Sequence, residues 1–102
     1  MRPIHLADLD KSRPVLVLTR EHVRPYLNAI TVAPITGTIR GLSTEVPVGK
    51  ANGLDHDSVV SCDNVTTIPR SAIGRRVGYL LPRQEPALAE AILAAYDLET
   101  GP

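Results

Sequence analysis

Two short apolar runs, residues 15–18 and 29–35, constrain the fold of this 102-residue chain more than any other feature. The first run is continuous, which is typical of a strand that is buried on both faces or central in a barrel. Each run has a polar group at its mouth, because Arg13 stands just before the first and Thr36 follows the second. If the two strands pair, the guanidinium and the hydroxyl meet at one edge of a sheet. That arrangement suits the binding of a phosphodiester.

Apolar and β-branched segments separated by Gly, Pro and Asn predict further short strands along the chain. Pro34 lacks a backbone donor, so we expect it at a strand end or at a sheet edge. Only the C-terminal segment has a clear helical pattern, with Leu88, Ile92 and Tyr96 at spacings of four and Pro86 in the first turn. The expected strands cover residues 4–8, 13–18, 29–35, 44–48, 58–62, 64–68 and 73–80, with a short helix over 21–27. The sequence therefore predicts a mainly β, α+β fold, a small closed barrel with a C-terminal helix laid against it.

Composition narrows the class of protein. The length indicates a single domain over residues 1–102, and 43% hydrophobic residues are enough for a core that is aliphatic, because Phe and Trp are absent. No apolar stretch approaches the length of a membrane span, and the N-terminal segment is too short and too acidic to be a signal peptide. The single Cys62 excludes an internal disulfide and a Cys-based zinc site. We expect a cytoplasmic protein.

Charges are unevenly distributed although the net charge is zero. Residues 11–50 carry six Lys or Arg against two Glu, and residues 70–83 carry four Arg and no acid. Acidic residues gather in residues 51–69 and 84–102. A neutral chain of this kind can present a basic face to nucleic acid, and an evenly mixed surface is the alternative.

Single polar residues have ordinary explanations. Arg13 alone is consistent with a solvated strand-end arginine, and Thr36 alone with a turn-capping hydroxyl. The three histidines are assigned to structural or surface positions, since none lies in a recognisable motif, and Cys62 is expected to be a small buried residue. The histidines are His5, His22 and His56.

Several segments, in order, resemble the MazF/PemK family of toxin endoribonucleases, also called mRNA interferases. The resemblance covers nearly the whole chain, and the order and spacing of the segments make it specific. They are Arg13-Pro14-Val15-Leu16-Val17-Leu18, Thr31-Val32-Ala33-Pro34-Ile35-Thr36, Asp57-Ser58-Val59-Val60, Asp63-Asn64-Val65-Thr66-Thr67-Ile68 and Arg76-Val77-Gly78-Tyr79-Leu80.

The resemblance implies an SH3-like barrel of the MazF/PemK/CcdB type, a homodimer, and a toxin that a cognate antitoxin inhibits through an acidic, partly disordered segment. It also implies sequence-selective cleavage of single-stranded RNA (mRNA, tRNA or rRNA) by attack of the 2′-hydroxyl, with no metal and no cofactor. The family's catalytic residues carry over to Arg13 and Thr36, and its base-contacting pair to Asp63 and Asn64. Flanking loop residues expected along the RNA path are Ser12, Thr38 and Arg40.

One departure from the family lies between the first two strands, where a longer Gly-rich loop is usual. Here Asp10-Lys11-Ser12 is nearly all of it. This departure motivates one alternative, a catalytically weak relative that binds RNA or an antitoxin. A second alternative, a CcdB-like gyrase poison, relies on a C-terminal Trp that this chain lacks. The residue that removes the 2′-proton is not identified, since arginine is a poor general base.

Overall fold

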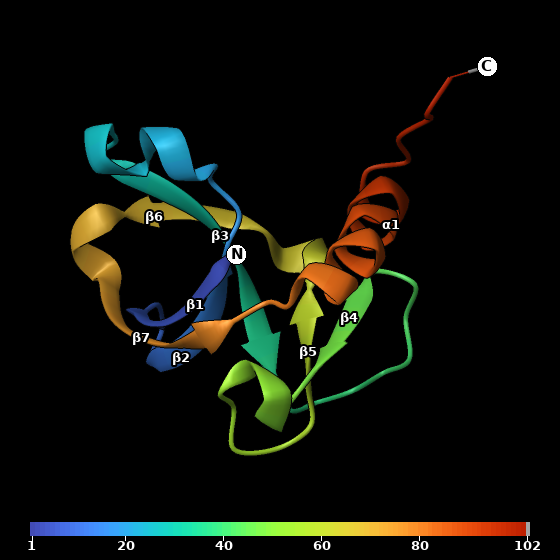
Figure 1. The fold of residues 1–102 in the computed structure, drawn as a ribbon, viewed down its shortest axis with the longest axis horizontal. Helices are drawn as coiled ribbons and strands as arrows, with labels where there is room; N and C mark the ends of the chain where they lie inside the picture. The colour runs from blue at the N-terminus through green and yellow to red at the C-terminus, as the bar shows by residue number, and fades with distance from the viewer. Residues whose placement is uncertain (102) are drawn as a thin grey trace.

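A curled antiparallel sheet with one α-helix beside it forms the computed structural model, which describes residues 1–101 (Figure 1). The strands follow the order β4-β5-β3-β2-β1-β7, and β6 pairs with β3 off this path. The elements are β1 (Pro3–Asp8), β2 (Ser12–Val17), β3 (Ala29–Thr36), β4 (Glu45–Val48), β5 (Ser58–Ser61), β6 (Thr66–Pro69), β7 (Ile73–Tyr79) and α1 (Glu85–Ala95). Short 3₁₀ helices cover Glu21–Tyr26, Lys50–Asn52, Cys62–Asn64, Arg70–Ala72 and Pro82–Gln84.

The predicted pairing of the two apolar runs is confirmed, because β2 lies antiparallel to β3 with Val15 opposite Pro34. Side chains of β2 alternate between two hydrophobic clusters, with Leu16 in one and Val15 and Val17 in the other. All three are at most 3% exposed. Full burial of such a side chain stabilises the fold by about 1.5–3 kcal/mol. The continuous run therefore forms a strand buried on both faces, as its pattern predicts.

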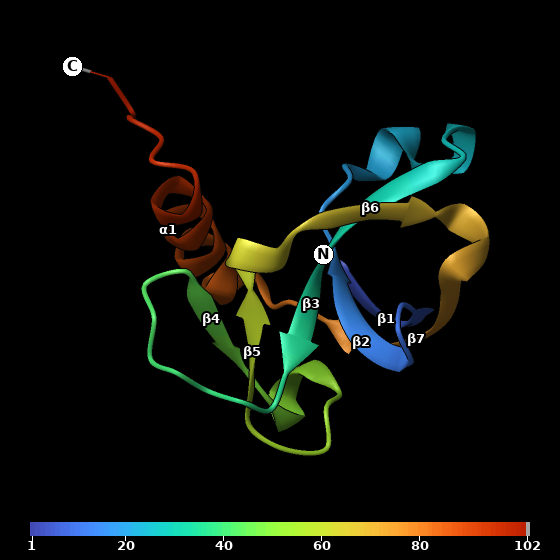
Figure 2. The ribbon, with the colours of Figure 1, turned by 180° about the vertical axis from the view of Figure 1, so that it is seen from behind.

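β3 is the centre of the sheet. One of its edges pairs with β2, while the other is shared between β6, opposite residues 29–32, and β5, opposite residues 35–36 (Figure 2). Pro34 lies at the break between β6 and β5, inside the strand, so our expectation of a strand end or outer edge was wrong. At this break the second edge has no paired strand among residues 1–101, so a missing backbone donor does little harm there.

The helix α1 packs on the sheet through its predicted apolar stripe, although not along its full length. Leu88 and Ala91 are buried in the cluster that contains Leu16, and Ile92 packs against that cluster. Tyr96, however, is 54% exposed, because α1 ends at Ala95 and the chain turns away (Figure 1).

The predicted fold class is confirmed, with less closure of the barrel than expected. Among residues 1–101, β4 and β7 end the path of hydrogen-bonded strands, so the sheet is a half-barrel. Predicted strand boundaries lie within two residues of those observed. In the same residues no helix is both long and apolar enough to cross a membrane.

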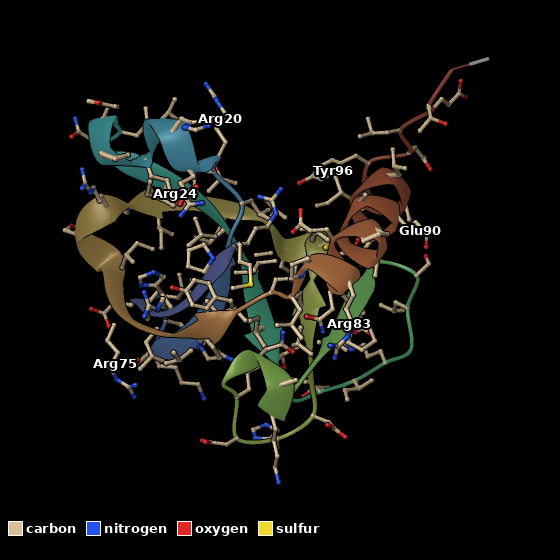
Figure 3. The ribbon with its side chains drawn as sticks, viewed as in Figure 1. Arg20, Arg24, Arg75, Arg83, Glu90 and Tyr96 are labelled. Atoms are coloured by element: carbon tan, nitrogen blue, oxygen red, sulfur yellow. The ribbon has the colours of Figure 1, made fainter. Side chains whose placement is uncertain are left out.

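Arginines from the two basic segments extend from different parts of the molecule. Figure 3 shows Arg20 and Arg24 near the 3₁₀ helix that follows β2, Arg75 on β7 and Arg83 near the start of α1. These positions favour the mixed-surface alternative over a single basic face. RNA binding by this chain would therefore depend on a local site.

Candidate active site

Arg13 lies near the start of β2, where pairing with β1 places it opposite Ala7. Its Nε and Nη2 donate hydrogen bonds to Oδ1 and Oδ2 of Asp10, at 2.8 and 3.1 Å. Asp10 belongs to the short connection between β1 and β2, and this geometry fixes the plane of the guanidinium. Sequence reasoning did not identify Asp10 as a site residue. The available signal was an acidic residue three positions before the arginine, on a connection too short to carry the two side chains apart.

The ion pair shifts the pKa values of both partners. The hydrogen bond from Arg13 is the main cause that lowers the pKa of Asp10 from 3.8 to about 2. The same hydrogen bond raises the pKa of Arg13. Arg13 therefore keeps its charge at every pH at which the protein is folded, and Asp10 is a weak base.

Thr36 is the last residue of β3 and lies opposite Val59 of β5. Its Oγ1 accepts a hydrogen bond from the backbone N–H of Thr38 at 3.1 Å. A hydroxyl that accepts in this way still has its own hydrogen to donate. Thr36 therefore caps the turn, as expected for a turn-capping hydroxyl, and it is also able to donate a hydrogen bond to a ligand.

Arg13 and Thr36 line one cavity of about 720 Å³. Six of the seven residues predicted to act on RNA lie around it, the exception being Ser12. They are Arg13, Thr36, Thr38, Arg40, Asp63 and Asn64. Two strands, the loop after β3 and the 3₁₀ helix after β5 thus converge on a single hollow, although these segments are far apart in sequence.

Asp63 and Asn64 are held in place by neighbouring side chains. Asp63 Oδ2 accepts a hydrogen bond from Thr44 Oγ1 at 2.6 Å, and Asn64 Nδ2 donates to Ser61 Oγ at 2.8 Å. One oxygen of each side chain is not engaged in these two bonds, so each has capacity for a further partner.

Glu45 shapes the loop that carries Thr38 and Arg40 across the cavity. Its carboxylate accepts hydrogen bonds from the backbone N–H groups of Arg40 and Leu42, at 3.2 and 3.1 Å from Oε1. Figure 2 shows this loop as the long span from the end of β3 to β4. Sequence reasoning did not identify Glu45, and no spacing pattern marks it.

Arg13 and Thr36 also line a second cavity of about 440 Å³, and Ser12 lies there. The wall of this cavity includes His56, which is exposed on the loop before β5, as expected. Arg13 and Thr36 therefore stand at the boundary between two hollows.

The remaining reactive side chains lie apart from this centre. Cys62 is 1% exposed, and burial raises the pKa of its thiol to about 11, which fits the expected small buried residue. His5 Nδ1 lies 2.8 Å from the carbonyl oxygen of Gly74. Within residues 1–101, no three His, Cys, Asp or Glu side chains gather closely enough to hold a metal ion.

Comparison with known proteins places this geometry in a family. Residues 4–96 match the model of the PemK-like, MazF-like toxin of type II toxin–antitoxin systems. The chain is 68% identical over 99 residues to Endoribonuclease MazF3 of Mycobacterium tuberculosis, covering 97% of this chain and 96% of that one. The solved Mycobacterium tuberculosis toxin MazF-mt6 superposes with a TM-score of 0.95 at 67% identity, covering 96% of this chain and 99% of that one. A mycobacterial endoribonuclease solved with its cognate antitoxin shares the fold, with a TM-score of 0.85 at 21% identity and coverage of 97% and 95%. The chain belongs to the PemK-like, MazF-like family of type II toxins.

Proposed function

We propose that this chain is the toxin of a type II toxin–antitoxin system. It is an endoribonuclease that cuts single-stranded RNA, with Arg13 and Thr36 as its catalytic residues. The observation that carries the proposal is their position on one cavity together with Asp63 and Asn64. The high identity to a relative named as an endoribonuclease supports RNA cleavage over gyrase poisoning or binding alone.

The nucleophile in this cleavage is the 2′-hydroxyl of the RNA itself. The 2′-hydroxyl releases its proton to water as its oxygen forms a bond to phosphorus, and the 5′-oxygen takes up a proton from water as its own bond to phosphorus breaks. The products are a 2′,3′-cyclic phosphate and a 5′-hydroxyl. Negative charge grows on the non-bridging oxygens in the transition state, so fixed donors aimed at them accelerate the reaction.

Arg13 is suited to stabilise this charge. Its guanidinium stays protonated, and Asp10 engages only Nε and Nη2. Within residues 1–101, Nη1 makes no hydrogen bond, so it is available to a phosphate oxygen. Thr36 donates its hydroxyl hydrogen to the same phosphate, because its oxygen already accepts from Thr38. Asp10 acts as a positioning residue, since a carboxyl with a pKa of about 2 is too weak a base for the 2′-hydroxyl.

The walls of the cavity recognise the RNA strand. A carboxylate and an amide, Asp63 and Asn64, hydrogen-bond to the edges of unpaired bases. Thr38 and Arg40 contact the strand from the loop after β3, and Ser12 contacts it from the opposite side of Arg13.

The same cationic centre accommodates an acidic, partly disordered antitoxin segment that orders on binding and excludes RNA. A homodimer would add buried surface to a small half-barrel and bring two such centres together. A toxin of this kind acts in the cytoplasm, where its RNA substrate is found.

The decisive experiment is primer extension on a long defined RNA after incubation with the purified protein in EDTA. We expect discrete cuts that leave 2′,3′-cyclic phosphate ends. Arg13→Ala should abolish them with the circular dichroism spectrum unchanged. Arg83→Ala is the matched control, because it removes an exposed arginine that lies outside both cavities. Cleavage by the Arg13→Ala variant at the rate of the parent protein would show the site to be wrong.

A further inference from the structure

A phosphodiester joins two nucleosides, so a centre that holds the scissile phosphate needs space on both sides of it. The cavity of about 720 Å³ supplies one side, with Asp63 and Asn64 in its wall. The cavity of about 440 Å³ shares Arg13 and Thr36 with it and has a different outer wall. Ser12 also lies in this second cavity.

His56 lies against the backbone of Gly37, the residue that follows Thr36. A Cβ atom built on Gly37 would lie 2.8 Å from Nε2 of His56, closer than non-bonded atoms come. The imidazole therefore occupies space that it would have to leave if residue 37 had a side chain. His56 is exposed and lines the second cavity, so its side chain is accessible to a ligand.

The loop that carries His56 is anchored at both ends. At its start, the Asn52 amide donates to the carbonyl oxygen of Tyr79 at 2.9 Å, and a Cβ atom on Gly78 would overlap the carbonyl oxygen of Asn52. At its end, Ser58 Oγ donates to the carbonyl oxygen of His56 at 3.2 Å. Anchoring of this kind positions the backbone of His56 before a ligand arrives, which reduces the entropy lost on binding.

The charges around the second cavity suit a nucleotide. Lys11, Arg13 and Arg75 contribute cations to its wall and Asp55 one acid. Figure 3 shows Arg75 extending outward from β7. Apolar side chains such as Leu54 complete the wall. Cations beside an apolar surface and an exposed ring are the features by which proteins hold the backbone and stack the bases of single-stranded RNA.

We propose that the second cavity binds the nucleotide on the other side of the scissile phosphate, and that the base of this nucleotide stacks on the His56 ring. This inference rests on the proposed function of Arg13 and Thr36. It adds a specificity-determining residue, His56, whose position depends on Gly37.

The test uses short single-stranded RNAs that span a mapped cut, varied at the nucleotide just before or just after it. His56→Ala should raise KM about tenfold, because stacking of one base is lost, with far less change in kcat. It should also weaken the base preference on one side of the cut only. His56→Phe keeps an aromatic face and should stay near the parent KM. Gly37→Ala displaces the ring and should act like His56→Ala in part.

His22→Ala is the matched control, because it removes an exposed histidine that lies outside both cavities. A parallel binding measurement uses an RNA with a 2′-deoxy nucleotide at the cut, so that affinity is measured without cleavage. Unchanged affinity and preference in His56→Ala would overturn the inference and leave the proposed function intact. Equal loss of preference on both sides, or a Phe variant as weak as the Ala variant, would also overturn it. A parent protein that neither cuts nor binds these RNAs would overturn both proposals.

Discussion

Replacing Asn52 by alanine should destabilise the fold by about 3 kcal/mol. Asn52 is 1% exposed, and its side chain connects three segments of the chain. Oδ1 accepts from the N–H of Gly49 at 3.0 Å, while Nδ2 donates to the carbonyl oxygen of Tyr79 at 2.9 Å and to Gln84 Oε1 at 2.6 Å. Alanine removes these three bonds, each worth about 1 kcal/mol net, together with a longer one from Gln84 Nε2 to Oδ1 at 3.3 Å, and leaves buried partners unsatisfied.

Urea unfolding followed by far-ultraviolet circular dichroism measures this loss. A domain of this size shifts its Tm by roughly 4–8 °C per kcal/mol, so the variant should melt roughly 12–24 °C below the parent protein. Asn28→Ala is the matched control, because Asn28 is exposed and its side chain makes no hydrogen bond within residues 1–101. A loss below about 1 kcal/mol for Asn52→Ala, or a loss equal to that of the control, would refute this account of the anchored loop.

Thr36→Val keeps the shape of Thr36 and removes its hydroxyl, so the cleavage rate should fall about 100-fold with the fold intact, as single-turnover kinetics would report. Survival of the parent rate would exclude a hydrogen bond from this hydroxyl. Asp10→Asn should lower the rate by loosening Arg13, whereas the parent rate should show no titration of Asp10 between pH 5 and 9. Because the pKa of Asp10 is lowered from 3.8 to about 2 on folding, its contribution to stability is complete above about pH 4 and is lost as the pH falls through 2. Acid unfolding of both proteins would show a smaller loss in Asp10→Asn if this is right. The Cys62 thiol, with its pKa raised to about 11, should resist a thiol reagent at pH 8 until urea is added. Rapid labelling of the folded protein would contradict its burial.

The strands were predictable from the sequence because burial on both faces of β2 leaves a continuous apolar signature. Leu16 and Val17 face different clusters, so neither position tolerates a polar residue. The position of Pro34 was not predictable, because it depends on where β6 ends and β5 begins along the second edge of β3. Pairing of this kind is decided by tertiary contacts that no local pattern contains.

Convergence of the predicted site residues on one cavity followed from the resemblance, but the neighbours that orient them did not. Asp10 lies three residues from Arg13, and its contact could have been found from the short connection alone. His56 and Gly37 are distant in sequence and meet only because the loop before β5 folds back over the end of β3. Such a contact carries no signal in a single sequence.

The short connection between β1 and β2 leaves the Arg13 guanidinium, the proposed phosphate-binding group, open to solvent. The carboxylate that holds Arg13 comes from this connection, where Asp10 supplies it. The Asp10 side chain is 70% exposed, so water screens the ion pair and a phosphate oxygen can approach the same guanidinium. In the proposed function, an acidic antitoxin side chain competes with an RNA phosphate for this exposed guanidinium.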